Sequence, residues 1–595
     1  MQLSFLDGLI IGLYLLCTLV IGIWVSRRSG ANMRDYFLGG KRIPWWALGV
    51  SNASGMFDIA GTMWLVSMMF VYGVKSAWLP WIWPVFNQIF LMMYLSAWLR
   101  RSNAMTGAEW LASRFGEGKG TQLSHAIIVI FALISAIGFI AYAFKGIGKF
   151  AEVFLPWDWS PNTYALAIFV LTTAYVVKGG MISVVVTEII QFVLMTIAAI
   201  AVGLIALSLV TPSMIENAVP EGWLSLGFAW ELDLDWTGLI DSVNEKIDAD
   251  GFSLFGLFFM MMLFKGILAS MAGPVPGYDM QRILACKDAK DAAKMSGVVS
   301  LVMLIPRYMM VVGLAVMALV FMGPEIQASN KSFDFEQVLP YAISHFIPVG
   351  LVGLLIAGLL AAFMSTFAAT VNAAPAYFVN DIYRRYLKPN ENERHYVKLS
   401  YVVSLILVMT GVGFGWVLDS INDIMQWVFA ALFGGYAAAN VLKWHWWRFN
   451  GYGYFGGMTS GLVASLALPI LFPALHPLYA FPYLLLAGAL GSILGSILTP
   501  ADDIRVLSKF YETVRPWGVW GPIKAHVQAQ NPAFVASAPS RDLFNVAIGI
   551  VWQTSLVLIA MYLILQAYLP LALSVLTCAL TSYILKRTWY DKLEA

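Results

Sequence analysis

The chain has 595 residues, with 36 Lys and Arg against 34 Asp and Glu, and its formal net charge is +2. Of its residues 60% are apolar and only 12% are charged, about half the ~25% that is typical of soluble proteins. So little polar surface could not cover a water-soluble globule of this size. The near-neutral charge also argues against a nucleic-acid binder, which needs a basic surface. We therefore expect an integral membrane protein.

Other classes of site are excluded by the cysteines, the histidines and one glycine-rich stretch. Cys17, Cys286 and Cys578 lie far apart, so the sequence supports neither a disulfide framework nor a zinc site. The six His form no HExxH pair, which argues against metal-hydrolase chemistry. The GEGKGT at residues 116–121 lacks the spacing of a P-loop, so ATP-driven transport is not expected. No nucleophile–base constellation indicates an enzyme.

Fifteen segments are apolar and long enough to cross a bilayer, which requires about 20 residues per helix. They lie near residues 5–25, 44–73, 78–98, 124–154, 160–178, 181–210, 253–278, 296–322, 349–380, 396–415, 424–442, 454–472, 480–498, 543–565 and 568–585. Most Lys and Arg fall on alternate connecting loops, as the positive-inside rule requires. The sequence thus predicts an N-terminus outside and a C-terminus inside.

Two connecting segments are long. Residues 211–252 are strongly acidic, and we expect them to form a solvated extracellular hairpin. Residues 499–541 alternate charges with Phe510, Trp517 and Trp520, a pattern typical of an amphipathic helix on the cytoplasmic leaflet.

Two of the predicted spans contain stretches that should interrupt a helix. Residues 51–61 (SNASGMFDIAG) crowd small and polar side chains into the second span, and residues 266–277 (GILASMAGPVPG) place Gly and Pro in the seventh. Interrupted helices at corresponding positions of two halves indicate a transporter site near the bilayer midplane. Here they begin two five-helix units, residues 44–210 and 253–442, which run in opposite senses because five is odd.

The ninth span carries adjacent hydroxyls at Ser365 and Thr366, with Ala362 one turn earlier. Hydroxyls and unwound carbonyls suit a hard monovalent cation. The alternative is that these hydroxyls only bond within their own helix or join two helices.

Charged residues inside spans are functional candidates, because burying a charge in hydrocarbon is costly. The spans contain two acids and four cations of this kind: Asp58, Glu188, Lys145, Lys149, Lys265 and Arg307.

Four stretches carry a resemblance to the sodium:solute symporter family. They are YFLGGKRIPWWALGVSNAS at 36–54, GAEWLASRFG at 107–116, GGMISVVVTEIIQ at 179–191 and MSTFAATVNAAPAYFVNDIYRRY at 364–386. The resemblance implies an all-α membrane protein with a LeuT-like core of two inverted five-helix repeats. One leading helix with its loop (residues 1–43) would precede this core, and four accessory helices (residues 443–595) would follow it.

The resemblance also implies a sodium site. Its ligands fall on Ser54, Phe57, Ala362, Ser365 and Thr366, and Glu188 would supply an anion near the cytoplasmic exit. Ala368 and Ala369 replace the hydroxyls of a second sodium site, which favours one sodium per solute. Asp58 lies beside the sodium-binding carbonyls, where it could strengthen sodium binding or form a structural salt bridge.

The residues that contact the solute transfer poorly from the family, because Gly61 and Pro80 stand where galactose-transporting relatives carry polar side chains. We predict contacts from five residues: Trp64, Lys145, Lys265, Arg307 and Gln426. Lys265 would pair with an acidic solute. A sugar acid, a neutral sugar or polyol, and an amino acid all stay open.

The sequence therefore predicts a sodium-coupled importer of a small organic solute that works by alternating access. Its partners would be sodium, the solute and the lipid bilayer, with no nucleic acid and no obligate protein partner. It would be a multi-pass protein of the plasma membrane, or of the inner membrane in a Gram-negative bacterium. A transporter-like solute sensor is the alternative.

Overall fold

The computed structural model describes residues 3–26, 32–81, 87–155, 157–259, 266–329, 333–417, 435–475 and 477–594. These residues form helices and connecting segments and contain no β-strand, so the all-α prediction is confirmed. The helices up to the acidic segment are α1 Phe5–Ser26, α2 Met33–Leu38, α3 Trp45–Met56, α4 Ile59–Tyr72, α5 Asn87–Phe90, α6 Ser96–Arg101, α7 Gly107–Phe115, α8 Lys119–Phe154 and α9 Pro161–Leu209. The acidic segment contributes α10 Pro212–Ala218 and α11 Ser242–Asp250.

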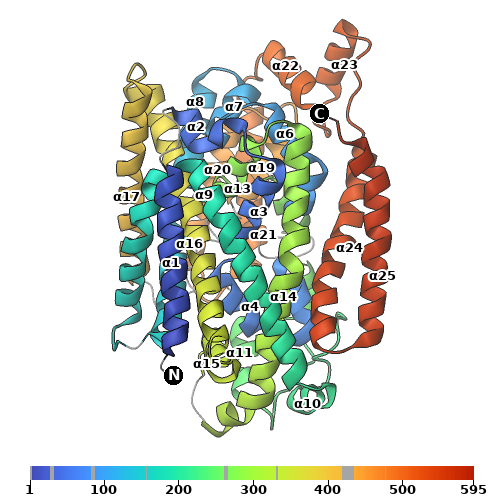
Figure 1. Cartoon of the computed structure of the whole chain (residues 1–595). Coiled ribbons are helices and arrows are strands. Elements are labelled where there is room, and N and C mark those ends of the chain that lie inside the picture. The colour runs from blue at the N-terminus through green and yellow to red at the C-terminus, as the bar shows by residue number, and fades with distance from the viewer. Residues whose placement is uncertain are drawn as a thin grey trace.

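The second half begins with α12 Leu254–Phe258, α13 Tyr278–Ala285, α14 Ala289–Ser329, α15 Val338–Phe346, α16 Leu351–Phe378 and α17 Glu393–Val417. It ends with α19 Gly435–His445, α20 Gly451–Leu471, α21 Pro477–Ile497, α22 Ile504–Val514, α23 Gly521–Gln530, α24 Pro539–Ile564 and α25 Tyr568–Thr588. In Figure 1 the long helices run side by side, and α24 and α25 stand at one edge of the bundle.

Among the described residues, nine helices are long and apolar enough to span a membrane. This number is smaller than the fifteen predicted spans for identifiable reasons. Several predicted spans are broken into shorter helices, as α3 and α4 are, and most of the predicted span 424–442 lies outside the described residues. The predicted turn between residues 178 and 181 falls at Gly180, whose φ of 61° lies in the left-handed region that favours glycine.

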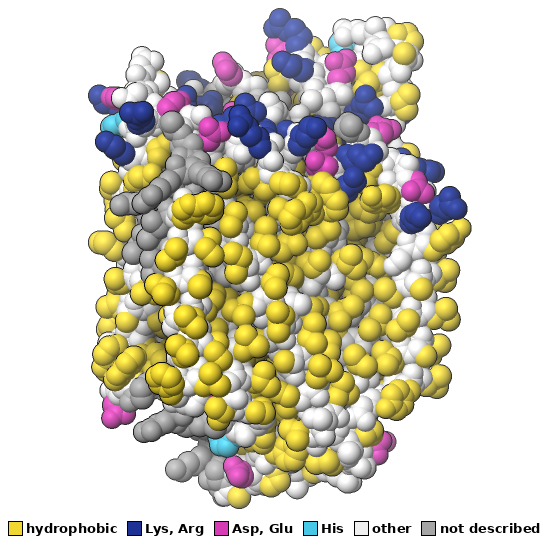
Figure 2. Space-filling model, in the orientation of Figure 1, with side chains coloured by type: hydrophobic (Ala, Val, Ile, Leu, Met, Phe, Trp, Pro, Cys, Tyr) yellow, Lys and Arg dark blue, Asp and Glu magenta, His cyan; other side chains and the backbone are white. Residues whose placement is uncertain are grey.

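The two ends of the molecule differ in charge. The described termini lie at opposite ends of the bundle (Figure 1). On the face shown in Figure 2, Lys and Arg gather at the end where the C-terminus lies, and hydrophobic side chains cover the middle. This distribution resembles that of a membrane protein with one basic end and an apolar belt.

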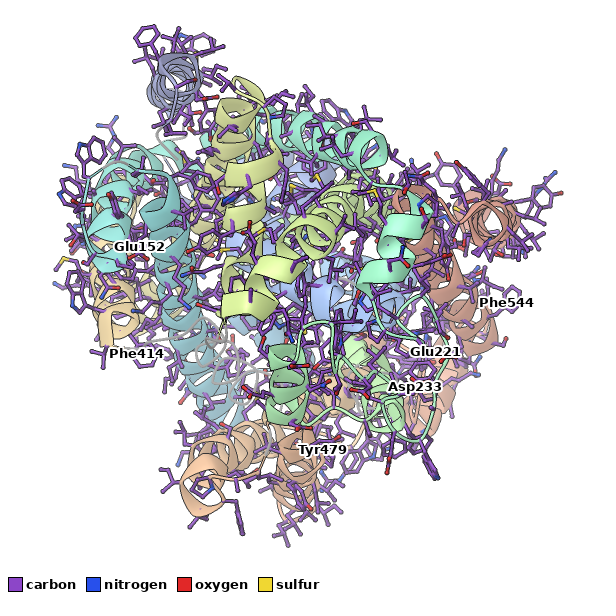
Figure 3. All side chains as sticks on the ribbon, turned by 90° about the horizontal axis from the view of Figure 1, so that it is seen from below. Glu152, Glu221, Asp233, Phe414, Tyr479 and Phe544 are labelled. Carbon is purple, nitrogen blue, oxygen red and sulfur yellow. The ribbon has the colours of Figure 1, made fainter. Side chains whose placement is uncertain are left out.

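The acidic segment is folded rather than hairpin-like, which corrects our expectation of a solvated hairpin. Trp223 and Trp236 are both fully buried. The indole nitrogen of Trp223 donates to the Phe70 carbonyl at 3.1 Å, and Trp236 stacks on the Phe70 ring. Asp233 lies 3.6 Å from the Lys75 ammonium, and Figure 3 shows it with Glu221 at this end of the molecule. Two buried tryptophans thus anchor the segment on the end of α4.

Residues 499–541 also differ from the prediction, because their aromatic face packs on the protein and not on the leaflet. Phe510 and Trp520 are 3% and 2% exposed. Both rings flank the Arg114 guanidinium, and Trp520 donates to the Trp444 carbonyl at 2.8 Å. The prediction of a helix lying on the leaflet is therefore wrong for this aromatic face, which covers α7 and α19.

Candidate functional site

The first predicted helix break lies between α3 and α4. Phe57 has φ −87° and ψ 66°, which are not helical, and Asp58 then caps α4 by accepting the Gly61 N–H at 2.7 Å. Asp is a preferred N-cap residue because its carboxylate bonds the free N–H groups of the first turn. The sequence FDIAG therefore ends one helix and starts the next. The prediction of an interrupted helix at residues 51–61 is confirmed.

The second predicted break is also confirmed. Residues 272–277 are not helical, and Gly273 has a φ of 86°. Two carbonyls freed by this break receive hydrogen bonds from α19: Trp444 donates to Ala272 at 3.3 Å and Tyr436 to Pro274 at 2.7 Å. Buried carbonyls need such partners. The contacts from α19 therefore satisfy two carbonyls of the non-helical stretch that precedes α13.

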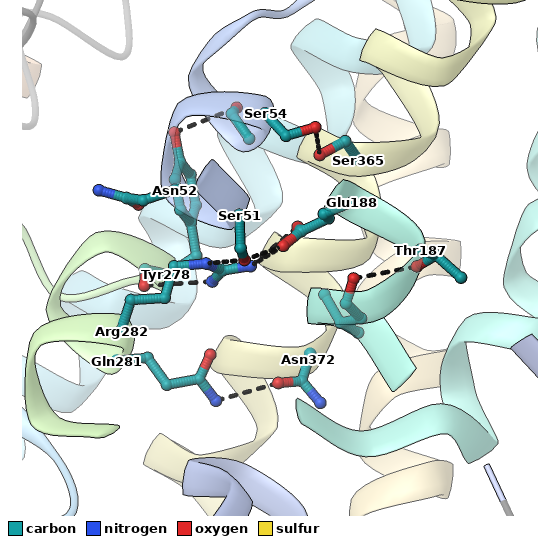
Figure 4. Close-up of polar contacts among 12 residues, drawn as sticks. Ser51, Asn52, Ser54, Thr187, Glu188, Tyr278, Gln281, Arg282, Ser365 and Asn372 are labelled. Carbon is teal, nitrogen blue, oxygen red and sulfur yellow. Dashed lines mark hydrogen bonds and ion pairs between the residues drawn. The ribbon is translucent and has the colours of Figure 1, made fainter. Parts of the chain in front are cut away.

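The predicted sodium ligands of α3 and α16 lie together at the first break. The Ser365 hydroxyl donates to the Ser54 hydroxyl at 2.9 Å (Figure 4). The Thr366 hydroxyl lies 2.8 Å from the Gly55 carbonyl and 3.1 Å from the Ala362 carbonyl. Ser54 and Ser365 are fully buried, and Thr366 is nearly so. The structure thus brings hydroxyl and carbonyl oxygens of two helices to one buried point.

These oxygens suit a hard monovalent cation, because they offer several neutral ligands without a strong fixed charge. The two neighbouring acids of the core, Asp58 and Glu188, are each paired with an arginine. A sodium ion here would be cargo held by neutral oxygens. The alternative hypothesis, that the Ser365 and Thr366 hydroxyls join two helices, also agrees with the structure, because both hydroxyls bond α16 to α3.

An ion pair contacts α3 at Ser51, one turn before this point. Arg282 of α13 donates to both carboxylate oxygens of Glu188 at 2.7 and 2.8 Å, and neither side chain has exposed surface. Arg282 also donates to the Ser51 hydroxyl at 2.9 Å, and Ser51 donates to Glu188 (Figure 4). This inner pair therefore joins α3, α9 and α13. Thr187 bonds only to its own helix, at the Ser183 and Val184 carbonyls.

Arg282 was not predicted as a site residue, because the seventh predicted span ends at residue 278 and leaves Arg282 in the following connecting loop. A non-helical stretch changes the length that each residue contributes along a span, so the end of an interrupted span cannot be counted as for a continuous helix. The signal that could have found it is the predicted break at 266–277, which allows the span to continue into Tyr278–Ala285.

A second ion pair lies at the start of α4. Arg307 of α14 lies 3.4 Å from the Asp58 carboxylate and donates to the Met56 carbonyl at 2.9 Å. Asp58 also accepts a hydrogen bond from the Tyr142 hydroxyl at 2.5 Å. Two roles were predicted for Asp58, either sodium binding or a structural salt bridge. Its pair with Arg307, which we call the outer pair, is such a salt bridge.

The other predicted solute residues are not brought together. Lys145 donates to the Asn162 amide at 3.1 Å, at the start of α9. Trp64 is half-buried on α4. Neither of them lines the cavity described next, and neither does Arg307. Lys265 and Gln426 lie outside the described residues.

A cavity lies among the ends of both broken helices. It is lined by Met56, Asn87, Ala132, Ser135, Ala136, Phe139, Val275, Pro276, Gly277, Tyr278, Asp279, Thr370, Ala374 and Tyr377. A smaller cavity shares Gly277 and Tyr377 with it and extends to Phe37 and Thr106, which come from the segments before α3 and before α7. The larger cavity thus continues towards the end of the molecule that carries α2 and α7 (Figure 1).

Comparison with known proteins decides the family. A sequence profile of the sodium:solute symporter family matches residues 36–461. The chain belongs to this family. It is therefore a sodium-coupled transporter of a solute and not an enzyme.

Curated relatives of this symporter match along most of its length. The sodium/mannose cotransporter of Bos taurus is 27% identical over 577 residues, which cover 84% of this chain and 87% of that protein. The sodium/glucose cotransporter of Vibrio parahaemolyticus is 22% identical over 546 residues, which cover 87% of this chain and 96% of that protein.

A solved structure of a Na+-coupled sialic acid symporter in a substrate-bound outward-open state has the same fold. Its TM-score is 0.63 at 20% sequence identity, covering 84% of this symporter and 98% of that chain. The two breaks and the α3–α16 contact therefore lie within a known transporter architecture.

Proposed function

We propose that this symporter imports a sugar-like solute together with one sodium ion. The observation that carries the proposal is the meeting of α16 hydroxyls with the broken end of α3, where Ser365 bonds Ser54 and Thr366 bonds the Gly55 carbonyl. The relatives that are named as mannose and glucose cotransporters support a sugar-like solute.

The sodium ligands in this proposal are the carbonyls of Ser54, Phe57 and Ala362 and the hydroxyls of Ser365 and Thr366. A bound sodium would bind α3 and α16 at the same time and so stabilise one arrangement of the two repeats. The absence of hydroxyls at Ala368 and Ala369 supports a single sodium. An entering charge releases about 2.3 kcal/mol per 100 mV of membrane potential, which can drive accumulation of a neutral solute.

In this proposal Glu188 is not a free anion. It belongs to the Arg282–Glu188 pair, which joins α3 to α9 and α13 and which we call the latch. The inner pair Arg282–Glu188 and its Ser51 contact join α13, α9 and α3 directly next to the sodium ligands. Movement of α3 on sodium release would pull Ser51 away from this pair. The latch would then weaken as the cytoplasmic side opens.

The proposed topology is fifteen spans in two inverted five-helix repeats with one leading and four accessory helices, in a LeuT-like arrangement. The N-terminus would lie outside and the C-terminus inside the plasma membrane or the inner membrane. The opposite positions of the termini and the basic C-terminal end support this orientation (Figures 1 and 2).

The test is uptake into proteoliposomes that contain the purified symporter, with a panel of labelled sugars, polyols and sugar acids. We expect at least one solute to accumulate under an inward sodium gradient, and a negative internal potential to increase its accumulation. An equal potassium gradient should give no accumulation. Accumulation that needs no sodium, or that a proton gradient alone supports, would contradict the proposal.

A further inference from the structure

The larger of the two cavities contains one charged side chain among the described residues that line it. This residue is Asp279, at the start of α13. Its Oδ1 accepts hydrogen bonds from the Asn52 amide at 2.6 Å and the Gln88 amide at 3.3 Å. The residue as a whole is partly exposed, and it lines the cavity.

No cation of the described chain pairs with Asp279. None lies within salt-bridge distance of its carboxylate, and Arg282, one turn further along α13, is bound to Glu188 and Ser51. The other arginine of the core, Arg307, is bound to Asp58 and the Met56 carbonyl. The described residues therefore offer this carboxyl group no cationic partner.

The hydroxyl groups that line the cavity are already engaged as donors. Ser135 donates to the Phe131 carbonyl, and Thr370 donates to the Thr366 carbonyl. Tyr278 donates to the Gly55 carbonyl, and Tyr377 donates to the Met280 sulfur. Each hydroxyl has a single proton, so these four groups cannot donate to a solute without losing a protein contact.

Unpartnered acceptors remain instead. Asn87 lines the cavity, is 7% exposed, and its amide oxygen has no hydrogen-bond partner. The amide oxygens of Asn52 and Gln88, whose nitrogens bond Asp279, also lack partners. Buried acceptors without donors are unfavourable, and a ligand that brings donors relieves them.

We infer that the solute binds in this cavity through its own hydrogen-bond donors, to the Asp279 carboxylate and the Asn87 amide oxygen. The fitting solutes are neutral polyhydroxyl compounds or compounds with an ammonium group. A carboxylate solute would meet the Asp279 carboxyl group, which has no cationic partner among the described residues, and hydroxyls that already donate to protein groups. The apolar wall formed by Met56, Phe139 and Val275 suits the C–H face of such a solute. This inference rests on the proposed function and narrows its solute to a donor-rich, non-anionic class.

The experiment measures ligand-induced thermal stabilisation of the purified full-length symporter in sodium buffer. The probes share one carbon skeleton: glucose, glucosamine and glucuronate, with mannose, mannosamine and mannuronate as a second set. We expect a neutral or amino sugar to stabilise the protein and the two acids to do so at least tenfold more weakly. Preference for glucosamine or mannosamine over the neutral sugar would identify the ammonium as the donor. A uronate that binds as well as its neutral counterpart overturns the inference.

Two variants test the residues with the best ligand of this panel. Asp279→Asn should weaken binding at least tenfold and Asn87→Leu about threefold to tenfold. Ser400→Ala should change binding less than twofold, because Ser400 does not line the cavity and its hydroxyl bonds within its own helix. Retained stabilisation by sodium alone shows that each variant is folded. Wild-type affinity in both Asp279→Asn and Asn87→Leu overturns the site.

If no probe binds in sodium, uptake in the proteoliposome assay tests the proposed function separately. Sodium-driven accumulation of a carboxylate in that assay refutes the inference about the solute and leaves the proposed sodium symport intact.

Discussion

Two buried arginine–carboxylate pairs lie on either side of the proposed sodium ligands, and they are built differently. The inner pair Arg282–Glu188 is bidentate, with both N–O distances at 2.7–2.8 Å, and is wholly buried. The outer pair Arg307–Asp58 has one N–O contact at 3.4 Å, and Asp58 is mainly bonded to Tyr142 and the Gly61 N–H. The inner pair joins α3 to α9 and α13, whereas the outer pair and Tyr142 join the start of α4 to α14 and α8.

The comparison shows that the two halves of the broken helix, α3 and α4, are held in place by different contacts. Asp58 caps α4 locally, and it also contacts Tyr142 of α8 and Arg307 of α14. Ser51 and Ser54 on α3 depend on side chains from α9, α13 and α16, which are far away in sequence. We therefore expect α3 to be the half that responds to sodium.

The largest expected effect is that of breaking the inner pair. Arg282→Leu leaves Glu188 buried without its partner and should lower stability by about 3–5 kcal/mol. The double variant Arg282→Leu/Glu188→Leu should recover most of this loss, because no unpaired charge remains. Thermal stability of the detergent-purified protein measures both. Lys388→Ala, which removes an exposed pair with Glu391 at 3.9 Å, is the control and should cost less than about 1 kcal/mol. An Arg282→Leu variant as stable as this control would show that the inner pair is not a latch.

The outer pair should tolerate loss of charge better. Asp58→Asn keeps an acceptor at the cap of α4 and leaves Arg307 its bond to the Met56 carbonyl. We expect a stability loss of about 1–3 kcal/mol, typical of a hydrogen bond to a charged group, and an unchanged sodium requirement. A clear rise in the sodium concentration needed for half-maximal uptake would instead assign Asp58 to sodium binding.

Removing one sodium-site hydroxyl should have a similar or smaller cost. Ser365→Ala or Thr366→Ala should raise the sodium concentration for half-maximal stabilisation about tenfold, which corresponds to about 1.4 kcal/mol. Ser400→Ala is a matched control, since that buried hydroxyl bonds only to the Tyr396 carbonyl of its own helix. If both site variants keep the sodium dependence of the control, the assignment of these hydroxyls is wrong.

The smallest expected effect is the change of stability with pH that Asp502 causes in the segment 499–541. Burial raises the pKa of Asp502 to about 7, although Arg114 at 3.7 Å opposes the shift. Because the folded pKa is above the ordinary value of 3.8, the associated stability is present at low pH and is lost as pH rises towards 7. The wild type should therefore lose about 1 kcal/mol between pH 6 and pH 7 relative to Asp502→Asn. Equal pH dependence of the two proteins in thermal melts would contradict this.

Local features were predictable from the sequence, and distant contacts were not. The breaks at residues 57–58 and 272–277 follow from Asp, Gly and Pro at those positions, and the Ser365–Thr366 pair is visible as adjacent hydroxyls. Arg282 was missed because its burial depends on where an interrupted span ends. Trp223, Trp236 and Trp520 were expected in solvent or lipid, because their partners Phe70 and Trp444 lie more than 70 residues away.

The most direct test of the account is the number of sodium ions that the purified symporter binds. Binding of ²²Na+ at saturating concentration should give one ion per wild-type chain. The double variant Ser365→Ala/Thr366→Ala should bind almost none at the same concentration, while Ser400→Ala should still bind one. Two ions per wild-type chain, or full binding by the double variant, would contradict a single sodium site made by α3 and α16.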